Sequence, residues 1–318
     1  MKAAEVTSTL MIGGSRIDVT MDTSDAPLPQ PEVLQWVKHA AESVAAYYAR
    51  FPVPHLTLRI VAFDGSGIRH GMTWPRDGGL IRILAGSKTS PEEFAEDWML
   101  THEMVHLAFP SMDDNQHWIE EGSATYVEPI ARIQAGHWTA MQMWHDLVRD
   151  MPKGEPQPGD EGLDHTHTWG RTYWGGALFC FVADVEIRKQ TKNQKGLQDA
   201  LRGVLDAGGN ITADWDLDKT LQVADHSVGV DVLEKLYAEW KDKAVAVDLP
   251  ALWKQLGVES SAGAIVLNDG APLATTQRAI VSGGSGQTRS GSDKTSAILP
   301  SGASRLIAVY AGRTAKSR

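Results

Sequence analysis

Two periodicities of apolar residues follow one another along the chain and predict strands near its start and helices beyond. Apolar residues recur every three or four positions in 32–50, which predicts an amphipathic helix. Residues 56–62 alternate between apolar and polar, and 79–85 form a short apolar run bounded by glycine, so each predicts a strand. Residues 1–30 predict a strand or two and a proline-containing connector.

Residues 90–93 predict the start of a helix. Ser90 is a capping residue, Pro91 suits the first helical position, and Glu93 can bond back to the cap. The apolar pattern that follows predicts one helix up to about Ala108, ended by Pro110.

The remainder of the chain is mostly helical in pattern. Helices are expected from 117 past 130, over 137–150 and 171–192, and as three or four shorter segments in 195–257, with a loop at 151–162. Residues 263–281 predict a short strand region. Residues 283–302 are rich in Gly and Ser and predict a flexible tail, after which 305–310 could form an edge strand.

This order of elements predicts an α+β fold. We expect a lobe at 1–110 that carries the sheet, a helical lobe at 111–260, and a short strand region with a flexible tail at 261–318.

Composition narrows the class of protein. The chain has 318 residues, 42% of them hydrophobic, a net charge of −10 and no basic run, which argues against a nucleic-acid partner. No apolar stretch approaches the ~18 residues that span a bilayer. Cys180 is the only cysteine, which excludes intramolecular disulfides and a thiolate metal cluster. The N-terminus does not read as a signal peptide, so a soluble, cytoplasmic protein is expected unless a leader was removed. The oligomeric state stays open.

The segment His102-Glu103-Met104-Val105-His106 carries the clearest chemistry. Histidines four apart on a helix lie on one face and can bind one metal ion, and the glutamate after the first can reach a water bound to it. A carboxylate from the next helix, Glu120 or Glu121, would complete three protein ligands. A fourth position left open is typical of catalytic zinc. The alternative is a surface helix that happens to carry two histidines.

The pair of motifs, His-Glu-x-x-His and Trp118-Ile119-Glu120-Glu121-Gly122, resembles the gluzincin metallopeptidases, especially their aminopeptidase-N-like and glycyl-aminopeptidase-like groups. In those groups the third ligand is the glutamate directly before the glycine, so the resemblance selects Glu121. It also implies a thermolysin-like catalytic lobe with a small sheet and one Zn²⁺ ion.

A tyrosine in a Tyr-x-x-Gly-Ala context stabilises the oxyanion in those enzymes. Tyr173-Trp174-Gly175-Gly176-Ala177 matches this pattern, so Tyr173 is similar to that residue. The alternative for Tyr173 is an aromatic residue of the core.

Two departures mark a divergent, bacterial-type member. Aminopeptidase-N-like enzymes bind the substrate amine with a glutamate before the metal helix, whereas the stretch taken here as corresponding, 77–83, has none. Fourteen residues separate His106 from Glu121, fewer than is usual in that group.

The resulting hypothesis is a zinc metallopeptidase that acts on peptides or a protein, with His102, His106 and Glu121 as metal ligands, Glu103 as general base and Tyr173 as oxyanion donor. The rivals are a non-catalytic zinc-stabilised binding protein on the same scaffold and a zinc hydrolase of a non-peptide substrate.

Three further histidines have weaker interpretations. His165 and His167 lie in a polar loop and could contact the oxyanion or the substrate, although a solvated loop is favoured. His117 could hold a ligand by a hydrogen bond.

Overall fold

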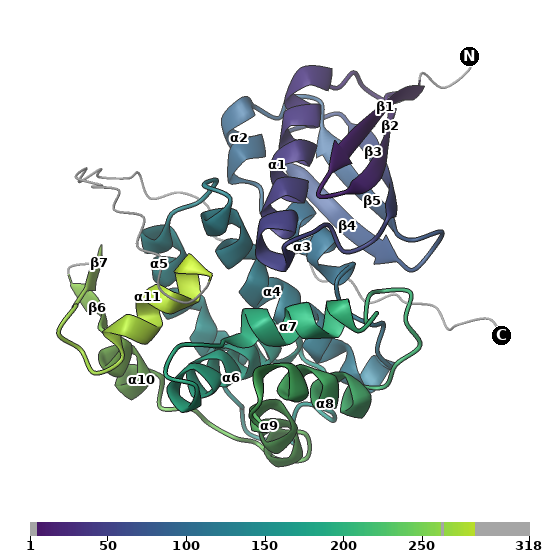
Figure 1. The fold of residues 1–318 in the computed structure, drawn as a ribbon. Helices are drawn as coiled ribbons and strands as arrows, with labels where there is room; N and C mark the ends of the chain where they lie inside the picture. Colours follow the sequence, from purple (N-terminus) through teal and green to yellow (C-terminus); the bar gives the residue numbers. More distant parts are fainter. Residues whose placement is uncertain (1–4, 262–263, 284–318) are drawn as a thin grey trace.

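The structure is a computed structural model that describes residues 5–261 and 264–283. A five-stranded sheet forms one end of it (Figure 1). Its strands are β1 (Glu5–Ile12), β2 (Ser15–Asp22), β3 (His55–Phe63), β4 (Ile68–Trp74) and β5 (Leu80–Gly86). They lie in the order β1-β2-β3-β5-β4, with β2, β3 and β5 parallel and the two outer strands antiparallel to their neighbours. Strand β4 is therefore an edge strand.

Within the described residues, one face of the sheet is buried and the other is partly exposed. Alternate residues of β3, Leu56, Leu58 and Ile60, are fully buried, whereas Arg59 between them is exposed. Helix α1 (Gln30–Tyr48), which connects β2 to β3, buries its apolar stripe in the same core. The alternation of strand residues thus directs one face inward.

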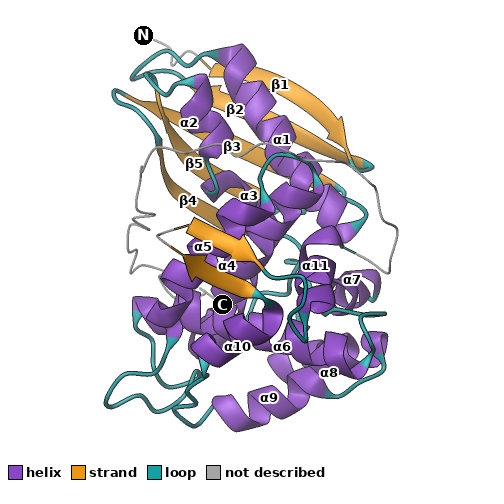
Figure 2. Ribbon diagram, turned by 90° about the vertical axis from the view of Figure 1, so that its left-hand side faces the viewer, coloured by secondary structure: helices purple, strands orange, loops and turns teal. Residues whose placement is uncertain are grey.

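The rest of the described chain is mostly helical (Figure 2). Its elements are α2 (Pro91–Glu96), α3 (Met99–His106), η1 (Asp114–Gln116), α4 (His117–Gln134), α5 (Ala140–Asp150), η2 (Met151–Gly154), η3 (Gly170–Gly175), α6 (Gly176–Gln190), α7 (Leu197–Asp206), α8 (Leu217–Val228), α9 (Val232–Trp240), α10 (Leu249–Leu256), the hairpin of β6 (Val258–Ser261) and β7 (Ala264–Leu267), and α11 (Ala274–Ser282).

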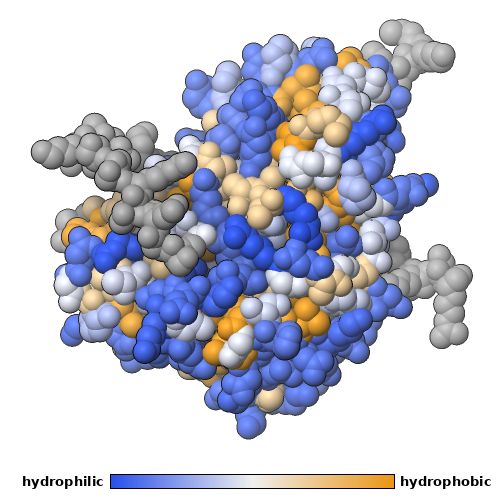
Figure 3. All heavy atoms as spheres, viewed as in Figure 1, coloured by the Kyte–Doolittle hydropathy of each residue, from blue (hydrophilic) through white to orange (hydrophobic). Residues whose placement is uncertain are grey.

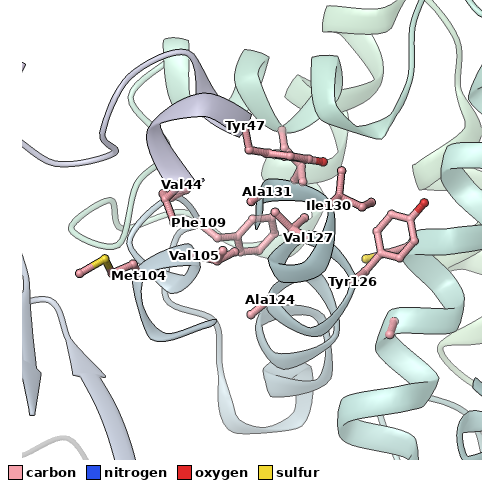
Figure 4. Close-up of a cluster of buried hydrophobic side chains, with 14 of the residues drawn as sticks. Val44, Tyr47, Met104, Val105, Phe109, Ala124, Tyr126, Val127, Ile130 and Ala131 are labelled. Atoms are coloured by element: carbon pink, nitrogen blue, oxygen red, sulfur yellow. The ribbon is translucent and has the colours of Figure 1, made fainter. Parts of the chain in front are cut away.

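Helices α3 and α4 occupy the centre of the molecule. Each packs against α1, and α4 also packs against α6. Figure 4 shows part of the shared core, in which Val105 of α3 and Phe109 lie between Val44 of α1 and Val127 of α4. This close packing fixes the two helices relative to each other.

The fold is α+β, as predicted, and most expected elements are present, including both strands and the helices at 32–50 and from 117 past 130. Strand β4 was missed because Arg69, His70 and Gly71 interrupt its apolar pattern, and a bulge lies between Arg69 and Met72. Helix α11 was also missed. The expected tail after residue 283 and the strand at 305–310 lie outside the described residues, and the division into lobes at 110 and 260 stays a prediction.

The prediction of one helix from residue 90 to about 108 was wrong. The capping box of Ser90 and Glu93 is present, but the helix that it begins, α2, ends at Glu96. The Asp97 carboxylate accepts hydrogen bonds from the backbone N–H groups of Met99 and Leu100, at 3.2 and 3.1 Å, and so begins a second helix, α3.

The face shown in Figure 3 is largely polar, with apolar residues in small separate groups. Large apolar side chains that are exposed in the described part of the chain, Met11, Met141 and Val266, come from distant elements. None of the helices described here has both the length and the apolar character that a membrane crossing requires.

Candidate metal centre

The two histidines of the predicted motif share one face of α3. His102 lies in its interior and His106 is its last residue, and their rings are 4.9 Å apart between centroids. The start of the helix is tied to α1, because Asp97 also accepts a hydrogen bond of 2.9 Å from the indole N–H of Trp36. Asp97 thereby orients the helix that presents both imidazoles.

Glu121 reaches this pair from the second turn of α4. Its Oε2 atom lies 3.0 Å from Nε2 of His102 and 3.5 Å from Nε2 of His106. Within the described residues these three form the one group of His, Cys, Asp or Glu side chains close enough to hold a metal ion together. The structure thus brings together the three residues that the motifs predicted.

The geometry of this group fits zinc. Two ligand atoms ~2.1 Å from one tetrahedral ion are ~3.4 Å apart, close to both distances from Glu121. Two imidazoles and a carboxylate are also a ligand set that zinc prefers. His102 and Glu121 are buried and His106 is half-buried, so the donors converge in a site largely screened from solvent.

His117, at the start of α4, holds the carboxylate of Glu121 from the other side. Its Nε2 lies 3.0 Å from Oε1 of Glu121, and its Nδ1 lies 2.9 Å from Oε2 of Glu120. Glu121 therefore directs Oε2 toward the histidine pair while Oε1 is engaged by His117. His117 thus makes the contact with a candidate ligand that its position in the sequence allowed.

The charges in this group are strongly coupled. Burial alone would raise the pKa of Glu121, but the charge of His106 and hydrogen bonds from His102, His106 and His117 outweigh it and hold that pKa well below its usual range. Burial would lower the pKa of His117, yet Glu120 and Glu121 raise it to about 10. The carboxylate of Glu121 is thus kept ionised, the form in which it can bind a metal.

Glu103 turns from α3 toward the edge of the sheet. It is buried, and its Oε2 accepts a hydrogen bond of 2.6 Å from the hydroxyl of Thr73 on β4. Burial raises the pKa of Glu103, opposed by the charges of His106 and His102 and by the Thr73 hydroxyl. Sequence reasoning missed Thr73, since the contact joins residues thirty positions apart in a strand that the apolar pattern did not reveal.

Tyr173 lies beside the histidine pair. Its ring is stacked on that of His102, with centroids 6.3 Å apart, and on that of Trp169, at 6.0 Å. It belongs to η3, a single π-helical turn directly before α6, and such turns are common at functional sites. The tyrosine predicted from the motif therefore lies near the candidate ligands.

Trp118, the first residue of the Trp-x-x-Glu-Gly motif, has a buried polar partner. Its indole N–H donates to Oδ1 of Asp164 at 2.8 Å, and the hydroxyl of Tyr237 donates to Oδ2 at 2.7 Å. Sequence reasoning missed this link. The neighbouring His165 bonds to Asp242 instead, in an exposed pair, and His167 is exposed as well.

The strand that borders the site is β4, not the segment 77–83 that the sequence suggested. Most of that segment belongs to β5, which lies inside the sheet between β3 and β4. Helix α3 packs against β4, where Thr73 contacts Glu103. Strand β4 also lacks a glutamate that could bind a substrate amine, since Ile68–Trp74 contains no acidic residue.

Comparisons by sequence find no relative. No model of a protein family matches the chain, and no curated protein does.

Comparisons by structure do find similar folds. An aminopeptidase N family protein from Idiomarina loihiensis superposes with a TM-score of 0.59 and 12% identity over 80% of this chain and 49% of its own. A two-domain M1 zinc metallopeptidase bound to L-arginine superposes with a TM-score of 0.51 and 13% identity, over 78% of this chain and 53% of the neighbour. For an M1 zinc metallopeptidase from Deinococcus radiodurans the TM-score is 0.50 and the identity 13%, over 78% of this chain and 54% of the neighbour.

These neighbours define the class of fold. The chain has the fold of M1 zinc metallopeptidases and spans about half the length of the structures that it matches. At this low identity the likeness concerns the fold alone. Within this fold, His102, His106 and Glu121 form a group that could hold a metal ion.

Proposed function

We propose that this chain is a monozinc peptidase in which Glu103 acts as general base. The observation that carries the proposal is the convergence of His102, His106 and Glu121 within bonding range of one ion, with Glu103 next to the first of them in the chain. Three protein ligands leave one position of a tetrahedral zinc ion open, as in catalytic sites, and Glu103 is not needed merely to hold the metal.

His102, His106 and Glu121 would hold the ion. Zinc, when bound, lowers the pKa of a water molecule and polarises a carbonyl group. Its remaining coordination position is free of protein ligands in this proposal, as catalysis requires.

Glu103 moves the proton. Its carboxylate takes a proton from water as the oxygen attacks the peptide carbonyl, and then delivers that proton to the leaving amine. The tetrahedral intermediate carries negative charge on the former carbonyl oxygen. In this proposal the Tyr173 hydroxyl donates a hydrogen bond to that oxygen. The proximity of the Tyr173 ring to His102, with centroids 6.3 Å apart, supports this role.

The substrate class is a peptide or a protein. The solved structures of similar fold include forms bound to L-arginine and to L-tryptophan, and free amino acids are chemically products of peptide hydrolysis. Whether the scissile bond is terminal or internal depends on how the substrate amine is bound.

Two measurements on the full chain test this function. The bound zinc is quantified by elemental analysis, and a mixed peptide library is incubated with the zinc-loaded protein. One zinc per chain with cleaved peptides supports the proposal. One zinc per chain with no cleavage of any peptide would favour the non-catalytic binding protein.

A further inference from the structure

The carboxylate of Glu103 is held by an edge strand of the sheet rather than by its own helix. Thr73 of β4 is buried, and its Oγ1 lies 2.6 Å from Oε2 and 3.1 Å from the backbone oxygen of Glu103. A hydroxyl has a single proton to donate, and the carboxylate is the stronger acceptor. The contact is therefore a short, charge-assisted hydrogen bond to Oε2.

Gly71, two residues earlier on β4, leaves the space that Glu103 occupies. A Cβ atom at Gly71 would lie 2.4 Å from Oε1, 2.5 Å from Cγ and 2.7 Å from Cδ of Glu103. Any larger residue would displace the carboxylate. Strand β4 thus adjoins both oxygens of the carboxylate. The Thr73 hydroxyl binds Oε2, and the backbone of Gly71 leaves room for Oε1.

The two carboxylate oxygens differ as a result. Among the described residues, Thr73 is the hydrogen-bond donor to the side chain of Glu103, and it engages Oε2 alone. Oε1 keeps its lone pairs available. A carboxylate with one oxygen fixed rotates less freely, so the direction of the other is set before a substrate arrives.

We propose that Thr73 is a positioning residue, whose hydroxyl fixes Oε2 of Glu103 and leaves Oε1 as the oxygen that accepts the proton from water. This inference rests on the proposed peptidase function. It explains why a buried threonine lies on β4, a strand that packs against α3. General bases lose efficiency steeply when misplaced, by ~100-fold for a shift of about 1 Å.

The test compares three variants of the full, zinc-loaded chain. Thr73→Val keeps the branched shape and removes the hydroxyl, whereas Thr73→Ser keeps the hydroxyl. Thr89→Val is the matched control, because Thr89 is equally buried but its hydroxyl bonds to the backbone oxygen of Gly86, at 2.7 Å. Peptide kcat and KM, zinc affinity by competition with a chelator, and thermal unfolding are measured for each.

We expect Thr73→Val to lower kcat by about 10- to 100-fold, the effect of one hydrogen bond to a charged group, with KM and zinc affinity within about twofold of the original. Thr73→Ser recovers most of kcat, and Thr89→Val leaves it unchanged. The recovery by serine separates positioning from a general loss of packing.

Four results would overturn the inference. An unchanged kcat in Thr73→Val, or a serine variant as slow as the valine variant, shows that the hydroxyl does not position Glu103. A loss of zinc affinity in Thr73→Val shows that the contact serves the ligands instead. If the unsubstituted protein cleaves no peptide, the peptidase function itself fails, and this inference with it.

Discussion

Gly122 and Gly176 lie in direct backbone contact where α4 crosses α6. A Cβ atom built on Gly122 would come within 2.2 Å of the carbonyl carbon of Gly176, and one built on Gly176 within 2.1 Å of the backbone oxygen of Trp118. Gly122 follows Glu121 in the chain, and Gly176 comes three residues after Tyr173. The glycines of the two motifs therefore touch. Their contact sets how closely Glu121 and Tyr173 can approach the candidate metal site.

Replacement of Gly176 by alanine should force α4 and α6 apart. We expect Gly176→Ala to lower the free energy of unfolding by about 1–3 kcal/mol, as overpacking of a close-packed core does, and to slow peptide cleavage as well. Chemical denaturation and steady-state kinetics measure the two effects. Gly270→Ala, in a loop where a Cβ meets its nearest neighbour at 3.3 Å, serves as control. Equal stability of both variants would contradict the role given to this contact.

Loss of His117 should weaken metal binding without removing a ligand. We expect His117→Ala to raise the dissociation constant for zinc about 10- to 100-fold, because residues that bond to metal ligands have effects of that size. Titration against a chelating dye measures it. His226, an exposed histidine of α8, provides the matched alanine control. A zinc affinity unchanged by His117→Ala would mean that Glu121 needs no support from Nε2 of His117.

Removal of zinc should lower the stability of the protein, because the metal binds the folded state. At free zinc a hundred times its dissociation constant, the expected stabilisation is about 2.7 kcal/mol. Thermal unfolding is followed with zinc and after extraction with a chelator, for the original chain and for Glu121→Gln. The shift is expected in the original chain and should largely vanish in the variant. A shift of equal size in both would remove Glu121 from the ligand set.

Peptides with a blocked N-terminus should remain substrates. Strand β4, which packs against α3, carries no acidic residue. In our proposal Glu103 is the general base and Glu121 a metal ligand, and Glu120 is paired with His117. A substrate amine thus finds no spare carboxylate among these groups. We expect matched peptides with free and acetylated N-termini to be cleaved with similar kcat/KM, as measured by mass spectrometry. A strict requirement for the free amine would assign an aminopeptidase activity instead.

The sequence predicted the candidate ligands better than their surroundings. The spacing of His102 and His106 has a fixed meaning on any helix, so the pair could be identified without knowledge of the fold. The choice of Glu121 over Glu120 was not possible from spacing, since both follow in the same helix. It came from the resemblance to gluzincins. In the structure Glu121 contacts His102 of the motif, whereas Glu120 contacts His117.

The surroundings depend on contacts between distant residues. The break at Asp97 arises because its carboxylate binds N–H groups of α3 and the indole of Trp36, a partner sixty-one positions away. The contact of Thr73 with Glu103 depends on a bulged edge strand whose pattern is not regular. Local periodicity carries no information on such pairs.

The most direct test of the central claim is the activity of Glu103→Gln. Glutamine keeps the shape of the side chain and cannot accept the proton, so we expect a loss of about 10²- to 10⁴-fold in kcat with zinc content unchanged. Glu96→Gln, at an exposed position of α2, should behave like the original chain. Full zinc occupancy together with undiminished peptide hydrolysis in Glu103→Gln would contradict the account.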